Sequence, residues 1–317
     1  MPITRKESNK RNARKIVAKS RKAVKRLKSI TSRKELMRFS QACLKAYKIQ
    51  GEIPTMPSQW AGTTYGKAYA VLVRFWNDEP ITQSGVFASD GNGKLPFYAF
   101  STLPVITCPG LGECGIFCYS LKSWRNAFAW LRQLINTLRL HSVSGRNQIV
   151  KAWQSIPQGE TVRLYVDGDF DSMETMRFWF SLITMRPDLK VYGYSKSWGL
   201  FLDWNKSGRP FPENYILNLS SGSRYDNLFR QAVAKLPIVR GEFIGVDSAL
   251  PMPKGKTSKE IRASIDWIPY QAAVRQAAQA AGYGKVFVCP GKCGDCGIKA
   301  HACGNAQLTI PVAIAIH

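Results

Sequence analysis

Histidine and acidic residues are scarce in this chain of 317 residues, and several familiar catalytic motifs are missing. There are three histidines, and 21 Asp and Glu stand against 45 Lys and Arg. No G-x-x-x-x-G-K-[ST] sequence is present, which excludes a P-loop ATPase or helicase, and there is no G-x-S-x-G elbow. No His-x-His pair accompanies a tyrosine, which counts against a relaxase-type nickase.

Long apolar runs are also missing. No stretch approaches the ~20 residues that span a bilayer, so we expect no membrane segment. The basic start Met1–Lys6 has no apolar segment behind it, so we expect no secretory signal. These absences predict a cytoplasmic protein, in which reduced cysteines favour metal binding over disulfides.

The positive charge is concentrated at the start of the chain. Residues 1–50 hold 17 Lys and Arg against two acids, a net of +15, whereas the remaining residues carry a net of +9. A strongly basic arm joined to a less charged remainder is typical of a protein that binds a polyanion. We expect nucleic acid, with DNA favoured over RNA. An anionic membrane surface is the second option, but the arm lacks a Trp/Phe/Leu face.

Small and apolar residues recur at helical spacing within 12–30, and Ser32–Glu35 reads as a capping box for a second helix. We therefore expect residues 1–50 to form a basic helical arm laid on phosphates, or else a solvated tail. The predicted nucleic-acid contacts are Arg11, Arg14, Lys15, Lys19, Arg21, Lys22, Lys25, Arg26 and Lys28, together with Lys196 and Arg224 at strand ends.

Two further regions follow the arm. Residues 51–106 predict a small antiparallel β region with a strand at 69–76 and a hairpin or loop around 89–94. Residues 107–317 predict an α/β core with cysteine clusters. In this core, strands and helices alternate, which indicates a mainly parallel sheet, open or curled into a partial barrel. Ligand sites in such folds lie beyond the carboxyl ends of the strands.

Seven of the eight cysteines fall into two tight groups. Cys289, Cys293, Cys296 and Cys303 have the spacing C-x3-C-x2-C-x6-C among several glycines, and Cys108, Cys114 and Cys118 have the spacing C-x5-C-x3-C. Crowded thiolates repel one another unless a cation lies among them, and glycines allow backbone to wrap closely around an ion. Both groups are therefore predicted metal ligands, in one shared site or in two.

The identity of the metal is open on spacing alone. Only Cys293 and Cys296 have zinc-knuckle spacing, and compact cysteine sets suit a cubane cluster, so a [4Fe–4S] centre is favoured over zinc and over reduced structural cysteines. Three thiolates on such a cluster leave one iron open, as in enzymes that use S-adenosylmethionine. Alternatively, a fourth ligand comes from elsewhere. Cys289–Cys296 also has the radical-enzyme spacing, but it lies near the end of the chain, whereas the signature of those enzymes begins a barrel.

Carboxylates follow the strand that ends at Val166. Asp167 and Asp169 are candidate catalytic residues that could hold Mg²⁺ for phosphoryl chemistry, while Asp171 or Ser172 is expected to cap the next helix. Aromatic residues near other strand ends are either base-stacking platforms or core residues; they are Tyr192, Trp198, Trp204 and Tyr225.

Several short motifs occur together in a recognisable order. They are Thr107–Gly110 through Cys118–Tyr119, Gly168–Phe170 with Ser172 and Trp179, Tyr194–Ser197, and Val288–Pro290 with Cys293 and Cys296. In this order they resemble the gene product 88 family of phages and mobile elements, over about residues 100–305. The resemblance implies a cysteine-bound metal centre and assigns no reaction, and the basic arm is not part of it.

The sequence thus predicts a nucleic-acid-binding iron–sulfur or zinc protein of a phage or plasmid that serves replication or processing of the element's DNA. The first alternative is an enzyme, either a metal-dependent nuclease or nucleotidyl transferase, or an iron–sulfur enzyme of the S-adenosylmethionine type. The second alternative is a virion-associated structural protein that neutralises packaged nucleic acid.

Overall fold

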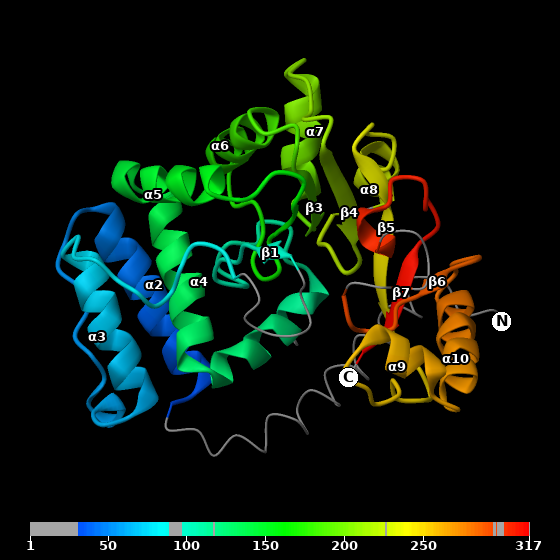
Figure 1. Ribbon diagram of the computed structural model, residues 1–317, viewed down its shortest axis with the longest axis horizontal. Coiled ribbons are helices and arrows are strands. Elements are labelled where there is room, and N and C mark those ends of the chain that lie inside the picture. The colour runs from blue at the N-terminus through cyan, green and yellow to red at the C-terminus, as the bar shows by residue number, and fades with distance from the viewer. Residues whose placement is uncertain are drawn as a thin grey trace.

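The computed structural model describes residues 31–88, 97–116, 118–225, 227–293, 296 and 301–316. Seven parallel strands form one curled sheet that resembles half of a barrel, in the order β1-β2-β3-β4-β5-β7-β6 (Figure 1). The strands are β1 Tyr98–Ala99, β2 Thr161–Leu164, β3 Lys190–Ser195, β4 Tyr215–Ser220, β5 Val239–Val246, β6 Phe287–Val288 and β7 Val312–Ala315. The predicted α/β class and parallel sheet are confirmed.

Helices connect and flank these strands (Figure 1). The α-helices are α2 Arg33–Lys48, α3 Thr64–Trp76, α4 Ala127–Leu140, α5 Val143–Gln154, α6 Met173–Thr184, α7 Trp198–Lys206, α8 Asn227–Val233, α9 Ser258–Ala263 and α10 Trp267–Ala280. Short 3-10 helices are η1 Ser58–Trp60, η2 Glu113–Ile116, η3 Tyr119–Arg125 and η4 Ala302–Gly304. Among the described residues, no helix combines the length and apolar character needed to cross a bilayer.

The two faces of the sheet have different coverings because side chains alternate along each strand. On one face, Val162, Val191 and Leu217 pack against α5, α6 and α7 in the largest buried cluster. On the other face, Tyr192 and Ile216 share a cluster with Cys289, Cys293, Cys296 and Cys303. Four cysteines from the late part of the chain therefore lie on the second face of the half-barrel.

An additional helical layer precedes the sheet. Leu36, Phe39 and Cys43 of α2 are buried together with residues of α3 and α4. The predicted cap is confirmed, since Ser32 Oγ accepts a hydrogen bond from the Glu35 amide. The second half of the predicted arm is thus part of a packed core. Residues 1–30, which carry the predicted nucleic-acid contacts from Arg11 to Lys28, lie outside the described residues.

The strand predicted at 69–76 is wrong, because this stretch belongs to helix α3. Thr63 caps the helix by accepting from the amides of Tyr65 and Gly66. The buried residues Tyr65, Ala68, Leu72 and Phe75 recur at helical spacing. In the described part of residues 51–106, antiparallel pairing is limited to the bridge between Ala88 and Ala99, and β1 itself pairs in parallel with β2.

Candidate functional site

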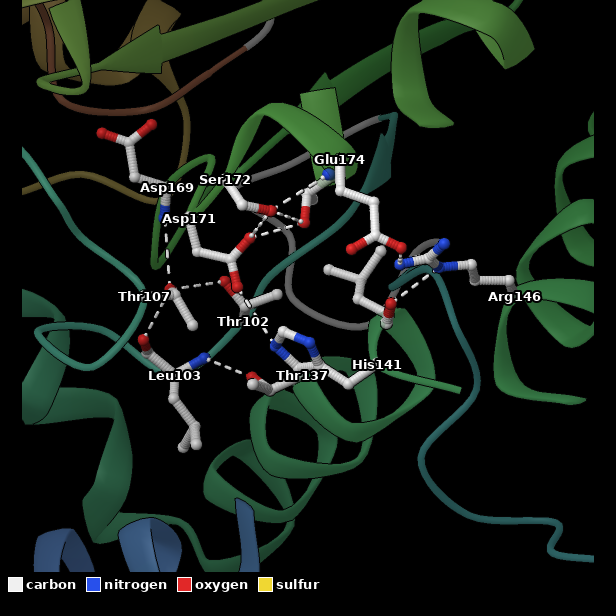
Figure 2. Close-up of polar contacts among 12 residues, drawn as sticks. Thr102, Leu103, Thr107, Thr137, His141, Arg146, Asp169, Asp171, Ser172 and Glu174 are labelled. Carbon is white, nitrogen blue, oxygen red and sulfur yellow. Dashed lines mark hydrogen bonds and ion pairs between the residues drawn. The ribbon is translucent and has the colours of Figure 1, made fainter. Parts of the chain in front are cut away.

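The turn after β2 is built around Gly168. Its φ of 78° lies in the left-handed region, and a Cβ there would overlap Thr102 Oγ1 and crowd Thr107 Oγ1. The Asp169 amide donates to Thr107 Oγ1 at 3.4 Å, and the two threonine hydroxyls lie 2.9 Å apart (Figure 2). The Asp-Gly-Asp turn is therefore fixed to the segment that leads from β1 to Cys108.

The Asp169 side chain is 4% exposed and joins the ends of two strands. Its Oδ1 accepts from Ser195 Oγ at 2.7 Å and from the Phe170 amide at 2.8 Å, and its Oδ2 accepts from the Lys196 amide at 2.7 Å. Burial raises the pKa of this carboxyl, and the hydrogen bonds oppose that rise. Asp169 thus holds the β2 and β3 ends together.

The neighbouring carboxylates have other partners. Asp167 Oδ2 accepts from Gln133 Nε2 of α4 at 2.8 Å. Asp171 Oδ1 accepts from Thr175 Oγ1 at 2.5 Å, and its Oδ2 lies 3.1 Å from His141 Nε2 (Figure 2). The two side chains Asp169 and Asp171 point in different directions in Figure 2. The three carboxylates therefore do not converge on one ion, and Asp171 supports the start of α6, which Ser172 caps as predicted.

A loop carrying Cys108, Cys114 and Cys118, here called the three-cysteine loop, is docked on the carboxyl ends of β3 and β4. The Arg224 amide donates to the Gly110 carbonyl at 3.1 Å, and Ser223 Oγ donates to the Lys196 carbonyl at 2.9 Å. A Cβ on Gly110 would overlap the Lys196 carbonyl, and one on Gly112 would lie 2.7 Å from the Arg224 nitrogen. Glycine at both positions permits this close approach.

The thiols of the three-cysteine loop interact electrostatically with one another and with the carboxylate turn. Burial raises the pKa of Cys108, nearby Asp169 and Cys118 raise it further, and Lys196 lowers it. Burial also raises the pKa of Cys118, with Cys114 and Asp167 contributing in the same direction. Thiolates in this environment would need a cation for stability.

Two of the five described non-glycine residues with a left-handed φ lie at the same edge. Val105, just before the three-cysteine loop, has a φ of 72°, and Tyr165, just after β2, has a φ of 54°. Non-glycine residues in the left-handed region cost on the order of 1–3 kcal/mol each and cluster at functional sites. This edge is therefore the best candidate site in the described chain.

The second set, here called the four-cysteine group (Cys289, Cys293, Cys296 and Cys303), lies on the other face of the sheet. All four belong to one cluster with Tyr192 and Tyr194. Burial raises the pKa of Cys289, and the other three thiols raise it further. Burial raises the pKa of Cys303 to about 11, although the Tyr194 hydroxyl donates to its sulfur. The predicted second cysteine group is thus brought together by the fold.

Arg163 of β2 was not predicted as a site residue. Its guanidinium lies 4.5 Å from the centre of the Tyr194 ring, and its Nε is buried without a hydrogen-bond partner among the described residues. Tyr119, next to Cys118, and Cys293 are both electrostatic neighbours of this cation. The signal available in the sequence was that Arg163 is the one charged residue of the predicted strand 161–166.

The remaining predicted residues differ in their burial and contacts. Lys196 Nζ donates to Ser220 Oγ, and Arg224 is exposed with its guanidinium 5.6 Å from the Tyr225 ring centre. Tyr192, Trp198 and Trp204 are buried, so they are core residues and not base-stacking platforms, and Tyr225 is half-buried. Among the described residues, no group of three or more His, Cys, Asp or Glu side chains is arranged to hold a single metal ion.

The fold and this edge define an α/β protein with a cysteine-bearing loop docked on a parallel half-barrel sheet. The family model described as Gene product 88 matches residues 72–298, so the chain belongs to the Gene product 88 family. The match includes both cysteine sets except Cys303 and excludes the basic residues before α2. No curated protein and no solved structure matches the chain.

Proposed function

We propose that this chain is an iron–sulfur enzyme in which the three-cysteine loop holds a four-iron cluster with one open iron that binds S-adenosylmethionine. One observation carries the proposal. Three thiols lie in a single loop at the carboxyl ends of parallel strands, where the Gly110 carbonyl accepts hydrogen bonds from the Arg224 amide and from Ser223 Oγ. Ligand sites of parallel α/β folds are built at this edge.

The donor set fits such a cluster. Cys108, Cys114 and Cys118 would bind three irons of such a cluster and would leave the fourth iron for an outside ligand. Because each thiolate binds a different iron, the sulfurs need not converge on one point, as the ligands of a single ion must. A cluster of this kind supplies one-electron chemistry to S-adenosylmethionine.

Other residues of the edge have positioning roles in this proposal. Asp169 fixes the β3 end through Ser195 and Lys196, and the Lys196 backbone in turn carries the three-cysteine loop. The Lys196 ammonium, which donates to Ser220, lies close enough to Cys108 to lower the pKa of that thiol. It therefore favours the thiolate form that binds iron.

The four-cysteine group fits a second, closed centre. Four thiolates would fill every iron of a cubane, so this centre would be structural or would transfer electrons. Asn218 Nδ2 donates to the Cys303 carbonyl at 2.9 Å, and Arg240 Nε donates to Asn218 Oδ1 at 2.6 Å. This buried chain of hydrogen bonds fixes the Cys303 backbone against β4 and β5.

Nucleic-acid binding is the second candidate function, and the charge of the chain favours it. Residues 1–30 carry twelve Lys and Arg against one acid, directly before α2. A protein of a phage or plasmid with this arm would bind the element's nucleic acid, with DNA favoured over RNA, and would serve its replication or processing. The two candidates are compatible, because the arm and the cysteine sets occupy different parts of the chain.

Electron paramagnetic resonance on the anaerobically reconstituted, reduced chain tests the first proposal. We expect a cluster spectrum that changes when S-adenosylmethionine is added, both in the wild type and after Cys293→Ser with Cys296→Ser. The change should disappear after Cys108→Ser. A protein that binds zinc and no iron, or a spectrum that S-adenosylmethionine leaves unchanged, would overturn it.

A further inference from the structure

A cavity of about 340 Å³, here called the β6 cavity, lies between α10 and the outer strand of the sheet. β6 is the last strand in the sheet order and packs beside α10 (Figure 1). One wall of the cavity is the stretch Lys285–Val288. The opposite wall is a stripe of α10 that carries Trp267, Gln271 and Arg275, which share one helix face because they are spaced by four. The cavity therefore runs along the edge of the sheet.

The backbone of β6 has pairing capacity on the cavity side. The amides of Phe287 and Cys289 donate to carbonyls of the segment 311–313 at 2.9 and 2.8 Å, so alternate residues face β7. Val286 and Val288 consequently direct their amide and carbonyl groups away from β7. Within the described parts of the chain, these groups form no hydrogen bond. An extended segment laid beside β6 would pair with both residues, as an added strand does.

The side chains around the β6 cavity are basic. Arg262, Arg275 and Lys285 line it, and no Asp or Glu is among its described lining residues. Arg275 and Lys285 are exposed, and neither forms an ion pair with the residues that the structure describes. The charge of the cavity therefore favours an acidic ligand.

The edge backbone distinguishes a peptide from a small anion. A phosphate would use the amides and the cations but would leave the carbonyls of Val286 and Val288 without a donor. A peptide strand presents an amide and a carbonyl at every second residue, about 6.6 Å apart, which matches the repeat of the edge. Ile268, one turn before Gln271, is 75% exposed and adds an apolar side chain next to the α10 stripe.

We infer that the β6 cavity is a docking site for an extended acidic segment of a partner protein, which adds a strand to the sheet beside β6. Val286 and Val288 pair with its backbone, and Arg275 and Lys285 bind its acidic side chains. Cys296 of the four-cysteine group also lines the cavity, so the partner lies against that group. The described lining includes no residue of the three-cysteine loop, so this docking site is independent of the enzyme function proposed above.

Fluorescence anisotropy with the full chain and a short labelled peptide of alternating Glu and Val tests the charged contacts. We expect Arg275→Gln with Lys285→Gln to weaken binding about five- to tenfold, because two exposed charge pairs are lost. Arg275→Lys with Lys285→Arg keeps both charges and should retain most of the binding. The matched control, Arg177→Gln with Lys151→Gln, removes one exposed arginine and one exposed lysine from α6 and α5 and should bind as the wild type does.

Hydrogen exchange tests the added strand itself. Amide exchange of Val286 and Val288 should slow when the peptide is added. The same peptide with N-methylated amides cannot donate to the edge carbonyls and should bind about tenfold more weakly.

Four outcomes would overturn the docking site. They are equal binding of the methylated and unmethylated peptides, equal losses in the variant pair and its control, no peptide binding up to about 1 mM, and unchanged exchange at Val286 and Val288. A single-stranded oligonucleotide that displaces the peptide and loses affinity with Arg275→Gln and Lys285→Gln would assign the cavity to nucleic acid and would also overturn it.

Discussion

Ser195 Oγ donates a hydrogen bond of 2.7 Å to Asp169 Oδ1 and thereby links the carboxyl ends of β2 and β3. The next residue, Lys196, donates its amide to the same carboxylate and presents its carbonyl to Gly110. The Asp-Gly-Asp and Ser-Lys-Ser motifs are consequently one structural unit beneath the three-cysteine loop. Asp169 is a positioning residue in this arrangement.

Replacing Asp169 by Asn should destabilise this unit. An amide has one acceptor oxygen, so its NH2 group would face the donors at Lys196 or Ser195. We expect the free energy of unfolding in urea to fall by about 1–3 kcal/mol, with reduced iron in the three-cysteine loop. Asp203→Asn, at an exposed position on α7, is the control. Equal stability of the two variants would contradict the positioning role.

Gly110→Ala tests the docking of the loop directly. The new Cβ would overlap the Lys196 carbonyl, and backbone must move to relieve the overlap. We expect a loss of about 1–3 kcal/mol in stability and selective loss of iron from the three-cysteine loop, measured by metal analysis. Gly284→Ala, where no atom lies within 4 Å of the added Cβ, should be neutral. Full iron loading of Gly110→Ala would show that the loop does not need this contact.

The sequence was sufficient for the large features of this structure because they depend on local patterns. Strand and helix periods alternate after Thr161, and each predicted strand from there is present, although β6 is short. Cysteine spacing also located the two sets. The strand predicted at 69–76 is wrong because a short run of seven apolar residues and Arg74 suits a buried strand and a helix equally well, and burial against α4 decides between them.

Contacts between segments that are far apart in the chain could not be predicted from the sequence. The sequence predicts Asp169 as a magnesium ligand and Lys196 as a nucleic-acid contact, yet the Asp169 carboxylate accepts hydrogen bonds from Ser195 Oγ and from the Lys196 amide. Leu36 of α2 and Trp124 of η3 also share one buried core although they lie in distant parts of the chain. No periodicity or spacing within either segment carries this information.

The contact between His141 and Asp171 predicts a pH dependence of stability. Burial raises the pKa of Asp171, but His141, Thr175 and Ser172 lower it more, so the folded value lies below the unfolded value of about 3.9. The resulting stabilisation is present above about pH 4 and is lost as the pH falls through the folded pKa.

Unfolding measured from pH 7 to 3 should therefore show a steeper loss in the wild type than in Asp171→Asn, which is already less stable at pH 7. Asp266→Asn, exposed before α10, should follow the wild type. Parallel curves for wild type and Asp171→Asn would contradict the contribution of this contact.

Two truncations should show that the charged segment contributes to nucleic-acid binding and that residues 31–50 contribute to folding. Deleting residues 1–30 removes a net charge of +11 and no described element, so we expect a folded protein with a much shallower salt dependence of oligonucleotide binding. Deleting residues 1–50 also removes the buried Leu36, Phe39 and Cys43 and should abolish cooperative unfolding, followed by circular dichroism. An unchanged salt slope after the shorter deletion would exclude the segment as the main nucleic-acid contact.

The central claim, that the three-cysteine loop holds a cluster of its own, is tested most directly by the iron and sulfide content of the anaerobically reconstituted chain. We predict about eight irons per wild-type chain and about four after Cys108→Ser, Cys114→Ser and Cys118→Ser together. Cys43→Ala, buried in the α2 core and outside both cysteine sets, should retain the wild-type content. Equal iron in all three proteins, or iron in none, would contradict the claim.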